Sequence, residues 1–263
     1  MNRLWDQPNR LLILGLSLLA GVLFIGLLSL LLPAGGPAAV VILDHNASLA
    51  PNSPFVYPFT VQNLMHLLFF VGLGEVYCRW RIAEREQAMN REGLLPEDYR
   101  VILQEHDLPA IRARVADRYD AEHGFLPSLI DLCILQFRAS RSVDQTVSVM
   151  NSSLELIDHR LDLRYAMLRY LVWVIPTIGF IGTVIGISLA MNLIDPAADE
   201  QPLGDIAKAL GISFYTTLVA LVESAILVLL MNLVQAREES ALNRAGHYTL
   251  TNLINRLYAG GRL

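Results

Sequence analysis

Four long apolar segments constrain the fold of this chain more than any other feature. They are residues 11–32, 59–77, 167–194 and 206–234. Each is long enough for a helix of about 20 residues, which crosses the roughly 30 Å hydrocarbon core of a bilayer. The composition agrees, since 54% of the 263 residues are hydrophobic and only 17% are charged. We therefore predict an all-α, polytopic membrane protein with four transmembrane helices.

Polar residues make the second segment the least regular of the four. Gln62, Asn63, His66 and Glu75 interrupt an otherwise leucine- and phenylalanine-rich run. His66 and Glu75 are nine residues apart, or about 13 Å along a helix, and fall in opposite halves of the membrane. For each of them we expect a role in helix packing or at the membrane interface. The first segment is longer than a signal-peptide core, so we interpret it as a membrane anchor.

The distribution of arginine predicts the orientation. Thirteen arginines lie between Arg79 and Arg169, whereas residues 33–58 contain neither lysine nor arginine and residues 195–205 are acidic. By the positive-inside rule, both termini and residues 79–165 are cytoplasmic. The predicted parts are an N-terminal membrane hairpin (1–78), a cytoplasmic helical region (79–165), a second membrane hairpin (166–236) and a cytoplasmic tail (237–263).

The predicted cytoplasmic region is rich in polar residues, and the spacing of its apolar residues is typical of helices. Leucine and isoleucine recur at helical spacing, which predicts one amphipathic helix from about Val143 into the third membrane segment. Long helices would thus extend from the membrane into the cytoplasmic region. Five arginines could dock a cytoplasmic rotor or regulator, with a solvated helical face as the alternative. They are Arg81, Arg85, Arg112, Arg114 and Arg118.

Small residues form one face on each helix of the second hairpin. On the third segment the face comprises Gly179, Thr183, Gly186 and Ala190, and on the fourth Ser213, Thr217, Ala220 and Ser224. Thr183 lies twelve residues before Asp195, and Thr217 twelve residues after Asp205. Both hydroxyls therefore lie about 18 Å from the outer connection if the helices are antiparallel neighbours.

Two interpretations of these faces are open. Small residues allow close helix packing in lipid, with each threonine bonding its own i−4 carbonyl. Alternatively, the faces line a narrow path or a rotating interface, and the hydroxyls help an ion or a partner's carboxyl across. Such hydroxyls serve protons and sodium ions equally well.

The amino-acid sequences of these two helices resemble those of a known family. The segments Pro176–Gly186 and Ile206–Leu221 are similar to the two signature helices of the MotA/TolQ/ExbB proton-channel family. The resemblance covers roughly residues 154–232. It implies a subunit that forms an ion channel and is not an enzyme. This subunit belongs to a complex driven by the ion-motive force of the bacterial inner membrane. The driven process, whether flagellar rotation, gliding, outer-membrane energising or defence, stays open.

The resemblance also implies partners and site residues. The family forms a homopentameric ring around two copies of a single-span, MotB/TolR/ExbD-like subunit whose membrane aspartate takes up and releases the ion. By position, Thr183 and Thr217 match the pore-facing threonines, with Ser213, Gly179, Gly186 and Ala220 on the same faces, and Pro176 matches a proline that kinks the helix. The third and fourth segments contain no aspartate, so a proton relay needs a carboxyl from elsewhere.

The chain departs from the family pattern on the fourth segment. Ala220 stands where a glycine is common, and Ile226 where a proline is common. Glu223 is an unusual acidic residue there, about 120° around the helix from Thr217. It either pairs with an arginine of another helix or takes part in the ion exit route.

The sequence lacks the residues that other classes of function require. An intramembrane aspartyl protease needs two membrane aspartates, and a serine protease needs a serine activated by a histidine. His66 is the sole histidine in the four segments, and nucleotide-binding, zinc and nucleic-acid motifs are absent from the sequence. We therefore expect neither an enzyme nor a cofactor. A passive membrane scaffold or sensor, whose small-residue faces only pack helices, remains the alternative function.

Overall fold

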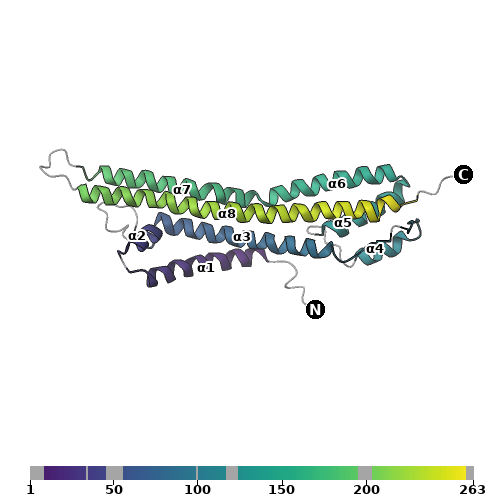
Figure 1. The fold of residues 1–263 in the computed structure, drawn as a ribbon, viewed down its shortest axis with the longest axis horizontal. Helices are drawn as coiled ribbons and strands as arrows, with labels where there is room; N and C mark the ends of the chain where they lie inside the picture. Colours follow the sequence, from purple (N-terminus) through teal and green to yellow (C-terminus); the bar gives the residue numbers. More distant parts are fainter. Residues whose placement is uncertain are drawn as a thin grey trace. The chain divides into compact units, whose positions relative to one another are not determined.

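The computed structural model describes residues 9–33, 35–45, 56–98, 100–116, 124–194 and 203–258. Its helices (Figure 1) are α1 (Arg10–Leu31), α2 (Pro37–Leu43), α3 (Val61–Met89), α4 (Leu108–Ala116), α5 (Phe125–Ser140), α6 (Val143–Arg164), α7 (Ala166–Met191), α8 (Leu203–Asn252) and the short 3₁₀ helix η2 (Ile254–Arg256). Within these described ranges, four stretches are long and apolar enough to cross a membrane, namely α1, α3, Val143–Met191 and Leu203–Arg256. The prediction of an all-α polytopic protein with four such helices is confirmed.

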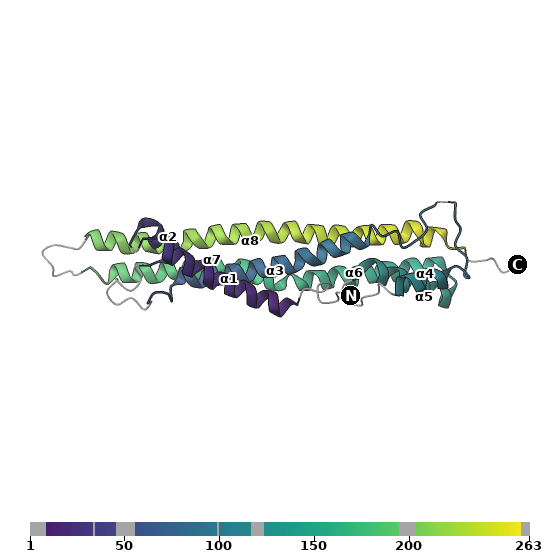
Figure 2. The same ribbon diagram turned by 90° about the horizontal axis from the view of Figure 1, so that it is seen from below.

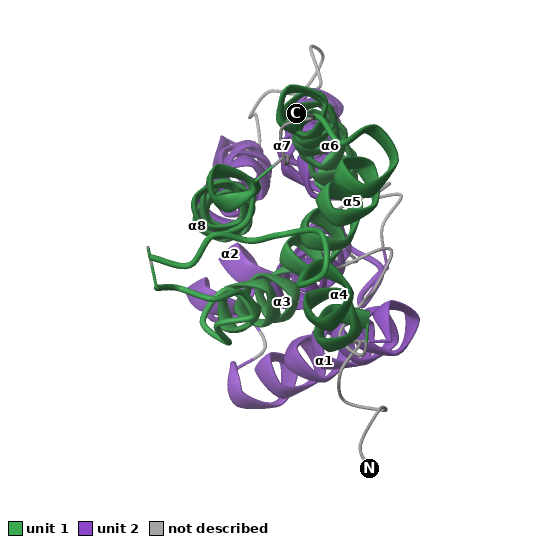
Figure 3. Cartoon of the chain, turned by 90° about the vertical axis from the view of Figure 1, so that its right-hand side faces the viewer, with its two compact units in different colours: residues 1–3, 79–166, 233–263 green, residues 4–78, 167–232 purple. Residues whose placement is uncertain are grey.

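The chain divides into two compact units, coloured separately in Figure 3. Unit 1 comprises residues 1–3, 79–166 and 233–263, and unit 2 comprises residues 4–78 and 167–232. Helices α3 and α8 each begin in unit 2 and end in unit 1. Unit 2 thus holds the apolar parts of all four membrane-length stretches, and unit 1 holds the polar helices between them.

In unit 2, small residues let α1 lie close against α3, beside which it runs in Figures 1 and 2. A β-carbon added at Gly21 would lie 3.2 Å from side-chain atoms of Leu67 and Phe70. Other positions of α1 carry exposed leucines, with Leu11 81% and Leu30 87% exposed. An apolar exposed side of this kind is what a helix bordered by lipid requires.

The connection between α1 and α3 contains the short helix α2, which the sequence analysis did not predict. Pro37 occupies its first turn, where proline lacks only an N–H that the helix would not use. Asp44 ends α2 in the left-handed conformation with φ 50°, and it is buried. The Thr60 hydroxyl donates to the carbonyl of Leu43 over 3.0 Å, so the end of α2 is tied to the start of α3.

In unit 1, the core forms around α5. Its apolar residues recur one turn apart and pack against α4 and α6. The buried residues of this face are Phe125, Leu126, Leu129, Ile130, Cys133, Ile134 and Phe137. Ile111 of α4 and Met150 of α6 are buried in the same unit.

The prediction of one unbroken helix from Val143 into the third membrane segment is wrong at a single residue. Tyr165 separates α6 from α7, and its N–H bonds the carbonyls of Asp162 and Leu163 instead of continuing the α-helical pattern. Its side chain is fully buried, and its hydroxyl donates to Glu238 Oε2 over 2.8 Å. Hydrophobic periodicity continues through this position, so it could not reveal the interruption.

Candidate functional site

The contact between α7 and the first part of α8, which we call the seam, is unusually close because glycines line it. A β-carbon at Gly179 would overlap the β-carbon of Ala220 and lie 3.2 Å from the carbonyl oxygen of Thr216. One at Gly186 would overlap the Ser213 hydroxyl. Gly182 faces Thr216 and also Val61 of α3. Side chains larger than hydrogen therefore have no room at these positions.

Three threonine hydroxyls gather within the seam. The Thr183 hydroxyl of α7 lies in hydrogen-bond contact with the Thr217 hydroxyl of α8. It also donates to the carbonyl of Ser213 over 2.8 Å and reaches its own i−4 carbonyl, that of Gly179, at 3.3 Å. The Thr217 hydroxyl lies 3.2 Å from the same Gly179 carbonyl. The two helices are thus linked through hydroxyl groups and not only through apolar contact.

The structure brings together the small-residue faces that the sequence predicted. Gly179, Thr183 and Gly186 meet Ser213, Thr217 and Ala220 across the seam. Ser213 and Ala220 are buried, whereas Thr183 and Thr217 are half-buried and reach the surface of unit 2. The glycines and Ala220 serve close packing here. A role of these residues in an ion pathway stays a prediction.

Sequence reasoning missed Thr216. Its hydroxyl donates to the Ser213 carbonyl over 2.7 Å, lies 3.2 Å from the Gly179 carbonyl and is 3.4 Å from the Thr183 hydroxyl. It is 3% exposed, on the side of the seam that Val61 covers. Its place three residues after Ser213 on the same helix was the available signal.

Each hydroxyl of the seam has more acceptors within reach than it has hydrogens. Thr183 and Thr217 each carry one hydrogen and contact each other and the Gly179 carbonyl. A hydroxyl can therefore redirect its hydrogen to an incoming oxygen while its neighbour keeps a bond. This is the behaviour needed to accompany a carboxyl or an ion along a helix surface.

Pro176 lies inside α7, and the structure shows how the missing hydrogen bond is replaced. Proline has no N–H, so the carbonyl of Val172, four residues earlier, loses its helical partner. The Ser224 hydroxyl of α8 donates to that carbonyl over 3.0 Å. The kink expected at Pro176 remains a prediction, but the replacement bond explains a serine on the apolar side of α8.

This replacement bond leads to a first test. Ser224→Ala leaves the Val172 carbonyl without a donor, and we expect it to destabilise unit 2 by about 1–3 kcal/mol. The same change in a Pro176→Ala background should cost much less, because residue 176 then supplies the N–H. Thermal unfolding of the four proteins in detergent measures both effects. Equal losses in the two backgrounds would refute the pairing.

Glu223 does have a partner on another helix, but the partner is a histidine and not the arginine suggested by the sequence. His66 Nδ1 of α3 lies 2.5 Å from Glu223 Oε1. Both residues are buried, at 4% and 7% exposure. Glu75 of α3 accepts a bond from Arg10 Nε of α1 over 2.9 Å. His66 and Glu75 thus each contact a polar side chain of another helix.

Unit 1 contains two buried carboxylates outside the apolar segments, Glu86 and Glu238. Glu86 Oε2 accepts the N–H of Phe125 over 3.0 Å, and its other oxygen has no hydrogen-bond partner. Burial raises the pKa of Glu86 to about 7, against the lowering effects of the Phe125 N–H and Arg85. Burial likewise raises the pKa of Glu238, which accepts the Tyr165 hydroxyl.

The raised pKa of Glu86 predicts a pH-dependent stability of unit 1. Its folded-state pKa lies above the ordinary 4.5, so its contribution is fully present below pH 4.5 and is lost as the pH rises through about 7. We expect the loss to reach about 3 kcal/mol at most. Glu86→Gln should remove this part of the pH dependence when unfolding temperatures are compared at pH 5 and pH 8. A variant with an unchanged pH dependence would contradict the assignment.

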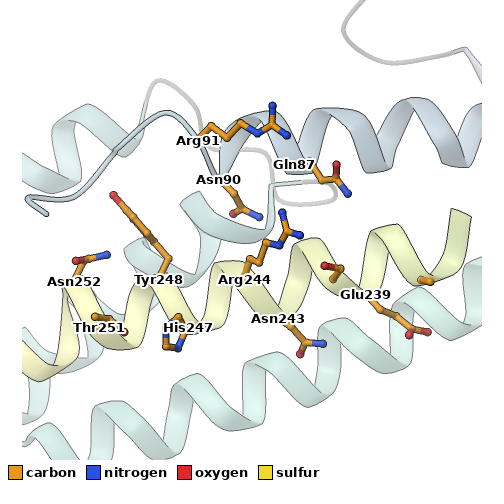
Figure 4. Close-up of a pocket in the computed structure, with 12 residues that line it drawn as sticks. Gln87, Asn90, Arg91, Glu239, Asn243, Arg244, His247, Tyr248, Thr251 and Asn252 are labelled. Atoms are coloured by element: carbon orange, nitrogen blue, oxygen red, sulfur yellow. The ribbon is translucent and has the colours of Figure 1, made fainter. Parts of the chain in front are cut away.

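Unit 1 also has a polar pocket of about 680 Å³ between the end of α3 and α8 (Figure 4). Arg244 points from α8 toward Gln87 and Asn90 of α3 in this view. Of the five arginines considered for docking a partner, Arg112 is held by Asp131 over 2.7 Å, Arg85 is half-buried, Arg81 and Arg114 are exposed, and Arg118 lies outside the described residues. None of the four described arginines lines this pocket.

The described residues offer no group of three or more metal-ligating side chains. Cys78 and Cys133 are buried thiols, and each lies in a different unit.

Comparisons with known proteins bear on the seam. Residues 123–245 match the model of the MotA/TolQ/ExbB proton channel family. Curated proteins and solved structures gave no match. The matched region contains α7 and the part of α8 that forms the seam, together with α5 and α6. The resemblance expected from the sequence is confirmed: residues 123–245 are similar to the MotA/TolQ/ExbB proton channel family.

Proposed function

We propose that this protein is the channel-forming subunit of a complex that uses the ion-motive force, and that it conducts protons. The observation that carries the proposal is the half-buried pair of hydroxyls, Thr183 and Thr217, in the family-matched hairpin. The similarity of residues 123–245 to the family model supports a proton channel subunit in an ion-driven complex. The two hydroxyls place polar groups at the surface of unit 2, on helices that are largely apolar.

The partner supplies the titrating group in this proposal. Residues 167–194 and 206–234 contain no aspartate, so the carboxyl that carries the proton comes from a single-span, MotB/TolR/ExbD-like subunit. Five copies of the chain surround two copies of that partner, with the seam of each copy facing inward. The half-buried position of Thr183 and Thr217 at the surface of unit 2 supports this arrangement.

The proposed location is the bacterial inner membrane, with both termini in the cytoplasm. The arginines that follow α3's apolar part and the acidic connection 195–205 support this orientation. Residues 195–202 of that connection lie outside the described residues. A rotor or regulator that docks on unit 1 belongs to the same proposal, and the exposed Arg81 and Arg114 are its contact points.

A passive scaffold is the second candidate, and one observation favours it. The glycines of the seam accommodate neighbouring side chains closely, and Thr183 reaches its own i−4 carbonyl, as expected of a motif that only packs helices. The two functions predict different results when the hydroxyl groups of Thr183 and Thr217 are removed. A scaffold tolerates it, and an ion pathway does not.

Co-expression with a single-span partner is the experiment that tests the channel. We expect ion flux into vesicles only when the partner with its membrane aspartate is present, and an assembly whose mass corresponds to five chains and two partners. Flux from this chain alone, without an assembly around a partner, would contradict the proposal.

A further inference from the structure

The polar pocket of unit 1, between the end of α3 and α8, has no role in the proposed channel. Its volume of about 680 Å³ lies within the range of small-molecule sites. In Figure 4 the side chains of Gln87 and Asn90 come from the end of α3, and Arg244 points toward them from α8. Arg91, two residues after the end of α3, also lines the pocket. We call this site the α3–α8 pocket.

Hydrogen bonds hold the walls of the α3–α8 pocket in place. Asn90 Nδ2 donates to the carbonyl of Ala241 over 2.9 Å, which joins the end of α3 to α8. The Tyr248 hydroxyl accepts the N–H of Leu95 over 3.2 Å. Glu97 Oε1 lies 3.3 Å from the same hydroxyl, but Glu97 does not line the pocket. These bonds fix the two walls relative to each other, which lowers the cost of ordering them around a ligand.

Arg91 and Arg244 give the α3–α8 pocket two guanidinium groups without a counterion. Neither has a hydrogen bond or an ion pair with another described residue. By contrast, Arg112 and Arg141 of the same unit lie 2.7 Å and 3.1 Å from carboxylate oxygens. The residues that line the pocket include one carboxylate, that of Glu239. The lining therefore carries an excess of positive charge, which attracts an anion.

The α3–α8 pocket also contains a hydrogen-bond acceptor without a donor. Asn90 Oδ1 is buried, and the described residues supply no hydrogen-bond partner for it. A buried amide oxygen in this state is costly until a donor reaches it. The pocket therefore suits a ligand with a negative charge for the two arginines and a hydroxyl group for Asn90. A phosphate ester that also carries a free hydroxyl group has both features.

This chemistry occurs in soluble molecules and in phospholipid headgroups, and the position of the α3–α8 pocket favours a soluble molecule. Gln87 lies ten residues beyond the second apolar segment (59–77), and Arg244 lies ten residues beyond the fourth (206–234). Ten helical residues span about 15 Å, whereas the headgroup layer on one side of a bilayer is about 5–8 Å thick. Along both helices, the pocket thus lies beyond the headgroup layer.

We propose that the α3–α8 pocket binds a phosphate ester that carries a free hydroxyl group. The guanidinium groups of Arg91 and Arg244 contact the phosphate oxygens, for which their paired N–H donors are suited. The hydroxyl group of the ligand donates to Asn90 Oδ1. The site lies in unit 1 and requires neither the seam nor a partner subunit, so its test is independent of the proposed channel.

Native mass spectrometry of the full chain, released from a maltoside detergent, tests the site with adenosine 5′-monophosphate (AMP) as the probe. We expect one AMP per chain, displaced by inorganic phosphate, and no binding of adenosine, which lacks the phosphate. Arg91→Gln and Arg244→Gln should each weaken AMP binding at least about 10-fold, because each removes a charged hydrogen-bond donor. Arg138→Gln removes an exposed arginine of α5 outside the pocket and should leave AMP binding unchanged.

Phosphatidylglycerol, added to the detergent micelles, separates the two sources of the phosphate because it also carries a phosphate ester and free hydroxyl groups. We expect AMP to stay bound in its presence. Binding of the lipid in place of AMP, weakened by the same two arginine variants, would uphold the phosphate site and identify a headgroup as its ligand. The proposal would be overturned if neither probe bound, or if AMP bound equally well to Arg91→Gln, Arg244→Gln and Arg138→Gln.

Discussion

Replacing Thr183 and Thr217 together by valine should abolish ion-driven work while the protein still assembles. Valine has nearly the shape of threonine but has no hydroxyl, so the close packing at Gly179 and Gly186 is kept. The contact between the two hydroxyls and their bonds to the Ser213 and Gly179 carbonyls are lost. An incoming carboxyl or ion then meets only apolar groups, and we expect proton flux to fall at least about 100-fold.

Two further variants make this result interpretable. Thr183→Ser with Thr217→Ser keeps the hydroxyls and should retain most of the flux. Thr216→Val removes a hydroxyl that is buried in the seam and should reduce flux far less, because Thr216 is only 3% exposed. Flux and assembly size are measured on the same preparations. Full flux in the double valine variant would leave only the packing role.

Gly179→Ala should disturb both folding and assembly. The added methyl group overlaps Ala220 and lies 3.2 Å from the Thr216 carbonyl, so α7 and α8 must move apart along the whole seam. We expect a loss of about 1–3 kcal/mol, as for other overpacked cores, together with poor assembly. The yield of assembled protein and its unfolding temperature in detergent are the measurements.

The chain supplies a matched control and a rescue for this variant. Gly26→Ala on α1 places the same methyl group where no atom lies within 4 Å and should be neutral. Ala220→Gly removes the β-carbon that Gly179→Ala would overlap, so the double variant should regain much of the lost stability. Without such a recovery, the close approach of α7 and α8 would not be the cause.

The sequence could predict the seam because one short connection joins its two helices. Counting twelve residues back from Asp195 and twelve forward from Asp205 places Thr183 and Thr217 at one depth, and the structure does bring their hydroxyls into contact. Helical spacing also identified which small residues share a face. These arguments need only the rise and the rotation per residue of a helix.

Contacts between helices that are distant in the chain could not be predicted in this way. His66 and Glu223 are 157 residues apart, and nothing in the periodicity of α3 or α8 gives the relative height of the two helices. The same holds for Arg10 and Glu75, which are 65 residues apart. The break at Tyr165 coincides with a buried bond to Glu238, which only the folded chain reveals.

Cross-linking from position 217 tests most directly whether the seam faces a partner's carboxyl. In a protein without Cys78 and Cys133, Thr217→Cys is combined with a cysteine beside the membrane aspartate of the co-expressed single-span subunit. Val222→Cys, 53% exposed and about 140° around α8, is the control. We predict a disulfide between the two subunits from position 217 and none from position 222. A disulfide from position 222 and none from position 217 would contradict the channel account.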